Sequence, residues 1–292
     1  IGFNTLTALD YGTLTYSHNI AIGFEAGKAI TTGTENTLIG GLAGDALTTG
    51  SYNVAIGKDA LGNEDTGGTN VAIGYAALKV QDAGANAYNV AIGFDTGKNV
   101  TTGVQNTLIG GAAGDALTTG LSNTALGMRA LSTDTTGRYS VAIGQGALEN
   151  QNFTGNNEVY NTAVGFSAGN DITTGIQNTI IGGLAGDALT TGGKNVAIGY
   201  NALTSEDAHG QNVAIGHNSL ANLNAGADAT NTALGFNSGY SMTTGTLNTL
   251  VGGLAGDALT TGARNVAVGY NALSQEDAHG RNVALGYQAL TT

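Results

Sequence analysis

The sequence predicts an all-β protein, a parallel β-solenoid in which 17-residue coils stack on one another. The first observation behind this prediction is a block, typified by NVAIGKDAL at residues 53–61, that recurs sixteen times in 292 residues. The second is the spacing of the copies, which is 17 residues except after each fourth copy, where it becomes 19, 21 and then 19. A unit this short buries no core alone. We therefore expect one continuous solenoid over residues 1–292, with a superperiod of about 70 residues that contains four coils.

Each copy predicts one strand and one glycine at fixed places. Counted from the first residue of the copy, positions 2 to 4 are apolar or β-branched and position 5 is always Gly. We therefore predict a short strand that ends at a glycine able to adopt positive φ or to admit a close backbone approach. Position 8 is a small residue, and a turn such as residues 48–50 often follows, so 17 residues suffice for two strands of about five residues and a two-sided coil. The copies begin at Asn19, Asn36, Asn53, Asn70, Asn89, Asn106, Asn123, Ser140, Asn161, Asn178, Asn195, Asn212, Asn231, Asn248, Asn265 and Asn282.

The Asn at position 1 predicts a ladder of stacked amides. Coils about 4.8 Å apart place identical side chains directly above one another, where each amide can donate to the next. We expect Asn19, Asn36, Asn53 and Asn70 to be its first members, with a weaker rung at Ser140. A structural ladder is the interpretation that we favour over a role in ligand binding.

The four coils of a period differ in where their large apolar side chain stands. The first two coils have Gly at position 9 and an apolar residue at position 12, whereas the last two have Leu at position 9 and usually a polar residue at position 12. One large group filling the same space from two alternative places keeps the volume of the core constant. The extra residues follow the fourth coil, within 81–88, 150–160 and 221–230, so we expect loops at one edge of the stack.

Composition narrows the classes of function. The chain has nine Lys and Arg and a net charge of −12, which argues against nucleic acid or an anionic membrane as its main partner. It has no Cys, so a disulfide framework and a thiolate metal site are excluded. No apolar run approaches a membrane span, so we expect no insertion of this segment into a membrane. Both ends fall inside a repeat unit, and we therefore expect a fragment of a longer fibre.

The blocks NVAIG, NTALG and SVAIG (residues 140–144) resemble the head repeats of trimeric autotransporter adhesins, the YadA-like left-handed parallel β-roll. Similar repeats occur in bacteriophage tail fibres, and the resemblance covers essentially the whole chain. It implies a homotrimer of left-handed β-rolls, an extracellular or virion-surface location, and binding rather than catalysis. The chain departs from the family in its longer unit, its four-coil superperiod and its edge loops. It also has no neck, coiled-coil stalk or membrane-anchor pattern, so the family's mode of attachment is not carried over.

The acidic residues favour structural roles over chemistry. Most recur in phase, as Asp45, Asp115, Asp187 and Asp257 do at position 10, whereas catalysis on a solenoid usually needs a unique cluster. We therefore expect no catalytic residue, no cofactor and no metal site. The EDAH segments at 206–209 and 276–279 set His beside two acids, but only two periods have them, so solvated turn residues are the interpretation that we favour. The GGLAGD segment at 182–187 resembles calcium-binding GGxGxD repeats with a different spacing.

Two further patterns concern side chains at the turns. We expect Lys28 to pair with Asp45, and Lys98 with Asp115, because each pair shares position 10 on neighbouring coils. The repeated TTG turns raise an ice-binding interpretation, since flat Thr ladders are one way to order water. Adjacent Thr side chains would point to opposite sides, which weakens that interpretation.

Candidate binding residues lie in the edge loops, because these are the stretches that differ most between periods. The alternative interpretation is an insertion that the fold tolerates and that binds no partner. In the longest loop they are Phe153, Asn156, Glu158 and Tyr160.

A trimer interface is predicted from the alternation of side chains along the strand. If positions 2 and 4 point into the coil, position 3 points out, and yet position 3 is never polar. It is Ala in twelve coils, and in the second coil of each period it is larger. We therefore predict that this position faces neighbouring chains of a parallel homotrimer. The four larger residues are Leu38, Leu108, Ile180 and Leu250.

The sequence thus predicts a structural and adhesive extracellular fibre segment, from a phage tail fibre or a bacterial surface adhesin. Its edge loops would bind a glycan or protein receptor on a host surface. The alternatives are a fibre segment of a glycan depolymerase and, with less support, an ice-binding solenoid.

Overall fold

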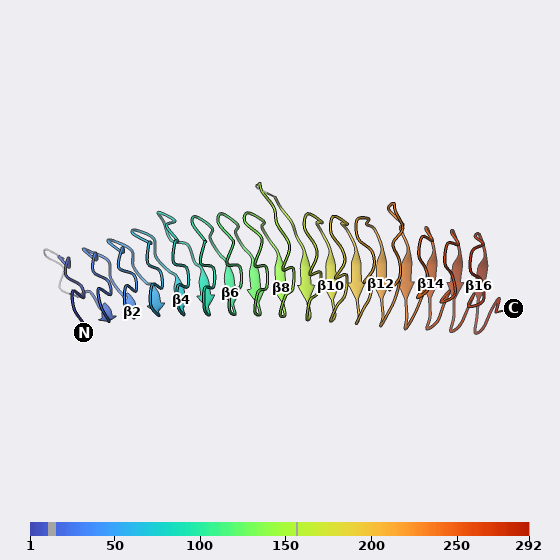
Figure 1. The fold of residues 1–292 in the computed structure, drawn as a ribbon, viewed down its shortest axis with the longest axis horizontal. Coiled ribbons are helices and arrows are strands. Elements are labelled where there is room, and N and C mark those ends of the chain that lie inside the picture. The colour runs from blue at the N-terminus through green and yellow to red at the C-terminus, as the bar shows by residue number, and fades with distance from the viewer. Residues whose placement is uncertain (11–15, 156, 292) are drawn as a thin grey trace. The chain divides into compact units, whose positions relative to one another are not determined.

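The computed structural model describes residues 1–10, 16–155 and 157–291, and these residues form a parallel β-solenoid with no helix. They contain sixteen strands of three residues, one per coil, each followed by an irregular return segment (Figure 1). The all-β solenoid fold and the 17-residue coil are therefore confirmed. No helix that could cross a membrane is found in the part of the chain that the structure describes.

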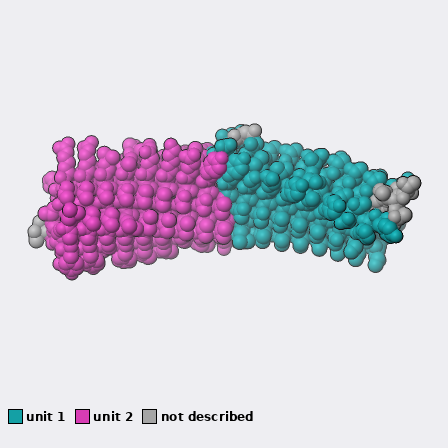
Figure 2. Space-filling view, turned by 180° about the vertical axis from the view of Figure 1, so that it is seen from behind, with its two compact units in different colours: residues 1–140, 152–158 teal, residues 141–151, 159–292 magenta. Residues whose placement is uncertain are grey.

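The chain forms two compact units, coloured separately in Figure 2. Unit 1 consists of residues 1–140 and 152–158, and unit 2 of residues 141–151 and 159–292. The strands of unit 1 are β1 (Ile20–Ile22), β2 (Thr37–Ile39), β3 (Val54–Ile56), β4 (Val71–Ile73), β5 (Val90–Ile92), β6 (Thr107–Ile109) and β7 (Thr124–Leu126). The strands of unit 2 are β8 (Val141–Ile143), β9 (Thr162–Val164), β10 (Thr179–Ile181), β11 (Val196–Ile198), β12 (Val213–Ile215), β13 (Thr232–Leu234), β14 (Thr249–Val251), β15 (Val266–Val268) and β16 (Val283–Leu285).

The register between neighbouring strands follows the sequence repeat. In unit 1, Ile20 of β1 stands opposite Thr37 of β2, 17 residues later. In unit 2, Val141 of β8 stands opposite Thr162 of β9, so the pairing absorbs the 21-residue step. Equivalent positions therefore stack on one another, and the inserted residues leave the stack as edge loops.

The return half of each coil is not a strand, which corrects the prediction of two strands per coil. Position 7 adopts positive φ, as at Glu25 (φ 55°), and position 9 does so even where it is Leu, as at Leu61 (φ 52°). Left-handed residues at alternate positions are incompatible with a pleated strand. The segment still bonds to its neighbours, since the N–H of Leu61 donates to the carbonyl of Ala77 one coil later, at 3.0 Å.

The invariant glycine at position 5 is required by a close contact between coils. Gly57 has φ 136°, and a Cβ atom built there would lie 2.3 Å from the carbonyl oxygen of Gly74 in the next coil. No side chain fits such a contact with backbone, and the φ value is itself one that side-chain-bearing residues rarely adopt. This is the close backbone approach that the sequence pattern predicts.

Position 3 points into the core, which overturns the predicted trimer interface. Along each strand the middle residue is buried and the flanking residues at positions 2 and 4 face outward, as in β6, where Leu108 is 0% exposed between Thr107 and Ile109. The same holds for all four candidate interface residues, Leu38, Leu108, Ile180 and Leu250, each 0% exposed within a single chain. These residues are core residues and are not available to a neighbouring chain.

The interior of each coil explains this orientation. It is lined mainly by Ala at positions 3 and 8 and by large apolar side chains at position 9 or 12, such as Leu61 or Leu47, both fully buried. A Cβ atom at Gly44 would lie 2.9 Å from the Leu38 side chain and 2.8 Å from that of Leu47. Leu38 therefore occupies the space that glycine at position 9 leaves free. The larger residue at position 3 is therefore matched to an internal glycine.

Candidate functional site

Three buried carboxylates mark the places where the repeat departs from a plain stack. Glu64, Asp134 and Glu206 stand at position 12 in the third coil of the first three periods, and each is 0% exposed. In the first two coils of a period this position holds a core apolar side chain. A buried carboxylate is tolerated only where hydrogen bonds replace its hydration. The hydrogen bonds that these three carboxylates accept therefore show what each of them does in the structure.

The hydrogen bonds have the same spacing at all three places. Each carboxylate accepts from a backbone N–H three residues later in its own turn, with distances of 2.7, 3.1 and 3.2 Å for Gly67, Gly137 and His209. Each also accepts from a backbone N–H nineteen residues later, with distances of 3.4, 3.1 and 3.3 Å for Ala83, Phe153 and Ala225. Those three donors belong to the inserted edge loops. The third-coil carboxylates thus anchor the edge loops to the solenoid.

The candidate binding residues of the longest loop have different environments. Phe153, in unit 1, is only 6% exposed, and its carbonyl accepts from the hydroxyls of Thr135 and Thr136 at 2.7 and 2.6 Å. It is therefore an anchor of the loop and not an accessible contact, which corrects its predicted role. Glu158, in unit 1, is exposed and forms a β-bridge with Arg138. Tyr160, in unit 2, is also exposed, and Asn156 lies outside the described residues.

The Asn residues at position 1 form a column that is buried for most of its length. The Oδ1 atom of Asn19 accepts from the backbone N–H of Asn36 at 2.8 Å, and the Nδ2 of Asn36 donates to the carbonyl of Gly50 at 2.9 Å. Asn53 and Asn70 repeat this backbone bond, and between them the Nδ2 of Asn70 also donates to the Oδ1 of Asn53 at 3.3 Å. Most bonds of the column therefore join a side chain to backbone, where the sequence predicted amide-to-amide bonds. These side chains satisfy buried backbone groups at the turn.

The acids at position 10 are half-buried, and burial raises the pKa of the carboxyls of Asp45, Asp115, Asp187 and Asp257 above the ordinary value. The predicted pairing between coils is wrong. Lys28 pairs with Glu25 at 3.1 Å and Lys98 with Asp95 at 3.2 Å, because the turn brings residues three apart in one coil together.

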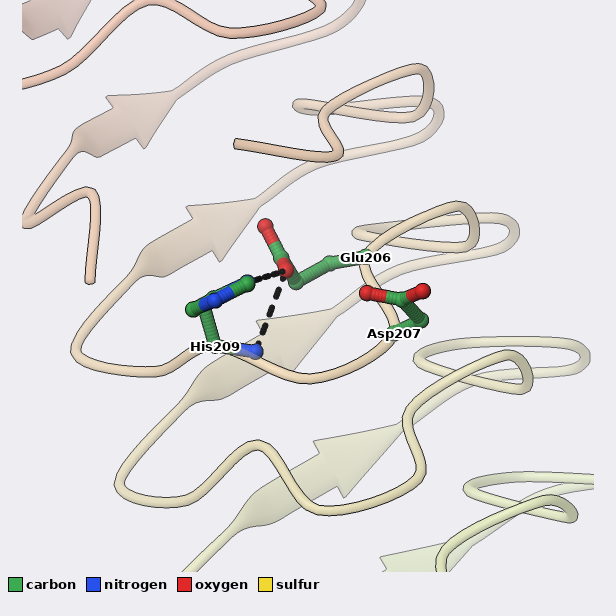
Figure 3. A group of neighbouring side chains, drawn as sticks. All are labelled: Glu206, Asp207 and His209. Carbon is green, nitrogen blue, oxygen red and sulfur yellow. Dashed lines mark hydrogen bonds and ion pairs between the residues drawn. The ribbon is translucent and has the colours of Figure 1, made fainter. Parts of the chain in front are cut away.

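The EDAH turns at 206–209 and 276–279 bring two acids and a histidine together. One ligand atom from each of Glu206, Asp207 and His209 lies within 4.8 Å of the others, and Figure 3 shows the Glu206 and His209 side chains side by side. The Glu206 carboxyl is buried, which raises its pKa, whereas the backbone N–H of His279 donates to the partly exposed carboxyl of Glu276 and lowers its pKa. The same sequence therefore occupies two different environments.

The first Thr of each TTG turn uses its hydroxyl within the solenoid. Thr31 donates to the carbonyl of Thr48 at 3.2 Å, and Thr173 donates to that of Thr190 at 3.1 Å. A hydroxyl that bonds to the next coil is not free to order surface water, which weighs against the ice-binding interpretation.

The outward side chains at positions 2 and 4 form what we call the outer strand face. It is β-branched or apolar at every coil and includes exposed residues such as Leu126, Ile181 and Leu234. Aromatic rings at position 6 stack along the same side of the coil, with centroids 5.1 Å apart for Tyr75 and Phe94. Soluble monomers rarely expose an apolar surface that continues over many repeats.

Comparison with protein families finds no family model that matches the chain, and comparison with curated proteins finds no match.

Proposed function

We propose that this chain is a structural and adhesive segment of an extracellular fibre, such as a phage tail fibre or a bacterial surface adhesin, and that it assembles as a parallel homotrimer. The observation that carries the proposal is the outer strand face, which presents Val, Ile, Leu and Thr to solvent at each coil of a chain otherwise rich in small and polar residues. Strands that are apolar on both faces are normally covered on both.

The trimer contact is assigned to positions 2 and 4. In β6 these are Thr107 and Ile109, which point away from the buried Leu108. Parallel chains in register would bring the same residues together at each coil, so a small contact is repeated many times. Each chain would then bury apolar surface that the solenoid core leaves outside.

The adhesive part of the proposal concerns the edge loops. Their backbone is fixed to the solenoid by the third-coil carboxylates, so exposed loop residues such as Glu158 and Tyr160 stand on a rigid base. Binding residues are often found on loops that a rigid scaffold positions. We propose a glycan or protein on a host surface as the partner, and no catalytic role for this segment.

Assembly is tested by sedimentation of matched variants. Wild-type protein is expected to sediment as a trimer, and Ile109→Asp should shift it toward monomer because the charge enters the proposed contact. Thr102→Asp, a change of the same chemistry on an exposed turn, should leave the trimer unchanged. Leu108→Asp should unfold its coil, since it buries an unpaired charge. A wild-type protein that sediments as a stable monomer contradicts the trimer.

Adhesion is tested with host cells and a loop replacement. Replacing residues 150–160 with a short Gly-Ser turn should abolish binding to host cells. The same replacement of residues 81–88 shows whether binding depends on the longest loop in particular. Intact binding after both replacements would rule out the loops as the receptor site. Incubation with capsule or lipopolysaccharide should release no oligosaccharide, and release would favour the depolymerase.

A further inference from the structure

The turn at residues 206–209 places a histidine nitrogen and a carboxylate oxygen, both buried, next to each other. The Nδ1 atom of His209 lies 3.4 Å from the Oε1 atom of Glu206. Nδ1 is buried, and it has no hydrogen-bond partner among the described residues. The Glu206 side chain is 0% exposed, and that of His209 is 27% exposed. A neutral imidazole nitrogen and a carboxylate oxygen are both electron-pair donors when no proton lies between them, so this approach favours a bound cation.

The rest of the Glu206 carboxylate is already held in place. Oε1 accepts from the backbone N–H of His209 at 3.2 Å, and Oε2 accepts from that of Ala225 at 3.3 Å. The carboxylate therefore has a fixed orientation before any ion binds. A preformed ligand of this kind lowers the entropy that ion binding must overcome.

The separation of the two atoms fits a tetrahedral metal ion. Zn²⁺ binds imidazole nitrogen and carboxylate oxygen at about 2.1 Å. An ion at that distance from both atoms, 3.4 Å apart, would make an angle of roughly 108° with them, close to the tetrahedral value. A carboxylate oxygen of Asp207 lies within 4.8 Å of a ring nitrogen of His209 and of a carboxylate oxygen of Glu206, and it would be the third ligand after a small rotation. That side chain forms no hydrogen bond or ion pair with any other described residue, so it can rotate.

We propose that Glu206, Asp207 and His209 bind one divalent ion of the zinc class, with water as the fourth ligand. One nitrogen and two oxygens form a borderline ligand set that suits Zn²⁺, whereas Ca²⁺ and Mg²⁺ prefer oxygen alone. Because Glu206 also holds Ala225, the ion would join the third coil of its period to the following edge loop. The proposal does not depend on the fibre function.

The chain contains its own comparison sites. Glu276, Asp277 and His279 repeat the same residues, but the His279 side chain is 83% exposed and its Nδ1 lies 2.9 Å from Glu276, already in a hydrogen bond. An ion there would have to break that bond and compete with water, so weaker binding is expected. In the second period, Asp134 is followed by Thr, Thr and Gly, which lack the second acid and the histidine, so no ion is expected there.

The test uses the chain without a polyhistidine tag, after treatment with EDTA, titrated with ZnCl₂ by calorimetry. Wild-type protein should show one tight site and one weaker site. His209→Ala and Asp207→Asn should each weaken the tight site at least tenfold, and His279→Ala should affect only the weaker one. His217→Ala is the matched control, because His217 is exposed but stacks between Tyr200 and Phe236 without acidic ligands, and it should change neither site.

A second measurement identifies the His209 atom that binds the ion. Nitrogen NMR of the His209 imidazole should show a shift of Nδ1 on addition of Zn²⁺ and none with Ca²⁺ or Mg²⁺. Equal Zn²⁺ affinity in wild type and His209→Ala would overturn the proposal, as would the absence of saturable binding. A His209 resonance that responds to pH but not to Zn²⁺ would show that a shared proton fills the position, and it would overturn the proposal as well.

Discussion

Removal of one amide from the Asn column should open the solenoid locally. Asn106 is fully buried in unit 1, where its Oδ1 accepts from the backbone N–H of Asn123 at 3.0 Å and its Nδ2 donates to the carbonyl of Gly120 at 2.9 Å. Asn106→Ala leaves that N–H and that carbonyl without these partners. A buried polar group left unsatisfied costs about 1–3 kcal/mol, so the two together should cost about 2–6 kcal/mol.

Hydrogen exchange is the suitable assay, because long repeat arrays do not unfold as one cooperative unit and a single melting temperature is poorly defined. The amide of Asn123 should be strongly protected in the wild type and should exchange about 5–150 times faster in Asn106→Ala, the range that corresponds to about 1–3 kcal/mol. Thr102→Ala, on an exposed part of the same turn, should stay within about 0.5 kcal/mol of wild type. Wild-type exchange of the Asn123 amide in Asn106→Ala would refute the reasoning.

Three other perturbations address the core, the loop anchors and the half-buried acids. Leu108→Ala should lower the free energy of unfolding by about 2–5 kcal/mol in denaturant, because it leaves a cavity in the core. A change near zero would contradict the burial of position 3. Asp134→Ala should remove the acceptor of the Gly137 and Phe153 N–H groups, so limited proteolysis should cut within residues 150–160 while the coils stay intact, and unchanged resistance would count against the anchor. Acidification from pH 7 toward the ordinary carboxyl pKa of 3.8 should stabilise the coils through the position-10 acids, because a pKa raised by folding means that the folded chain binds the proton more tightly. Thermal unfolding should show this gain in the wild type and not in the variant with all four acids changed to Asn. A gain that persists in the variant would refute the prediction.

The coil length and the strand positions could be predicted from sequence because they are fixed by local backbone requirements. Gly57 and its equivalents stand where a carbonyl of the next coil leaves no space for a Cβ atom, so the glycine period reports the coil length directly. The direction of the side chains could not be read in the same way. Alternation along a strand divides residues between two faces without saying which face is inside. The clue was available in Leu38, whose size is matched by Gly44 at position 9 of the same coil.

Two other features depend on tertiary context that the pattern alone does not contain. Leu61 adopts a left-handed conformation that is unusual for a residue with a Cγ branch, so no residue type in the return segment spoke against a second strand. The polar residues at position 12 were visible as exceptions to the apolar pattern. Their role required knowledge that Glu64 in the third coil and Ala83 in the loop of the fourth coil lie next to each other, which only the fold shows.

The loop anchors also determine how such a chain can change length during evolution. A coil bonds mainly to its immediate neighbours, so loss or gain of one coil would by itself leave most of the stack intact. The carboxylate in the third coil, however, also holds the inserted loop at the end of the fourth coil, as Glu206 does with Ala225. A deletion that separates them leaves a buried carboxylate without its donor. Recombination should therefore be tolerated in whole periods of four coils, and natural length variants should differ by multiples of about 70 residues.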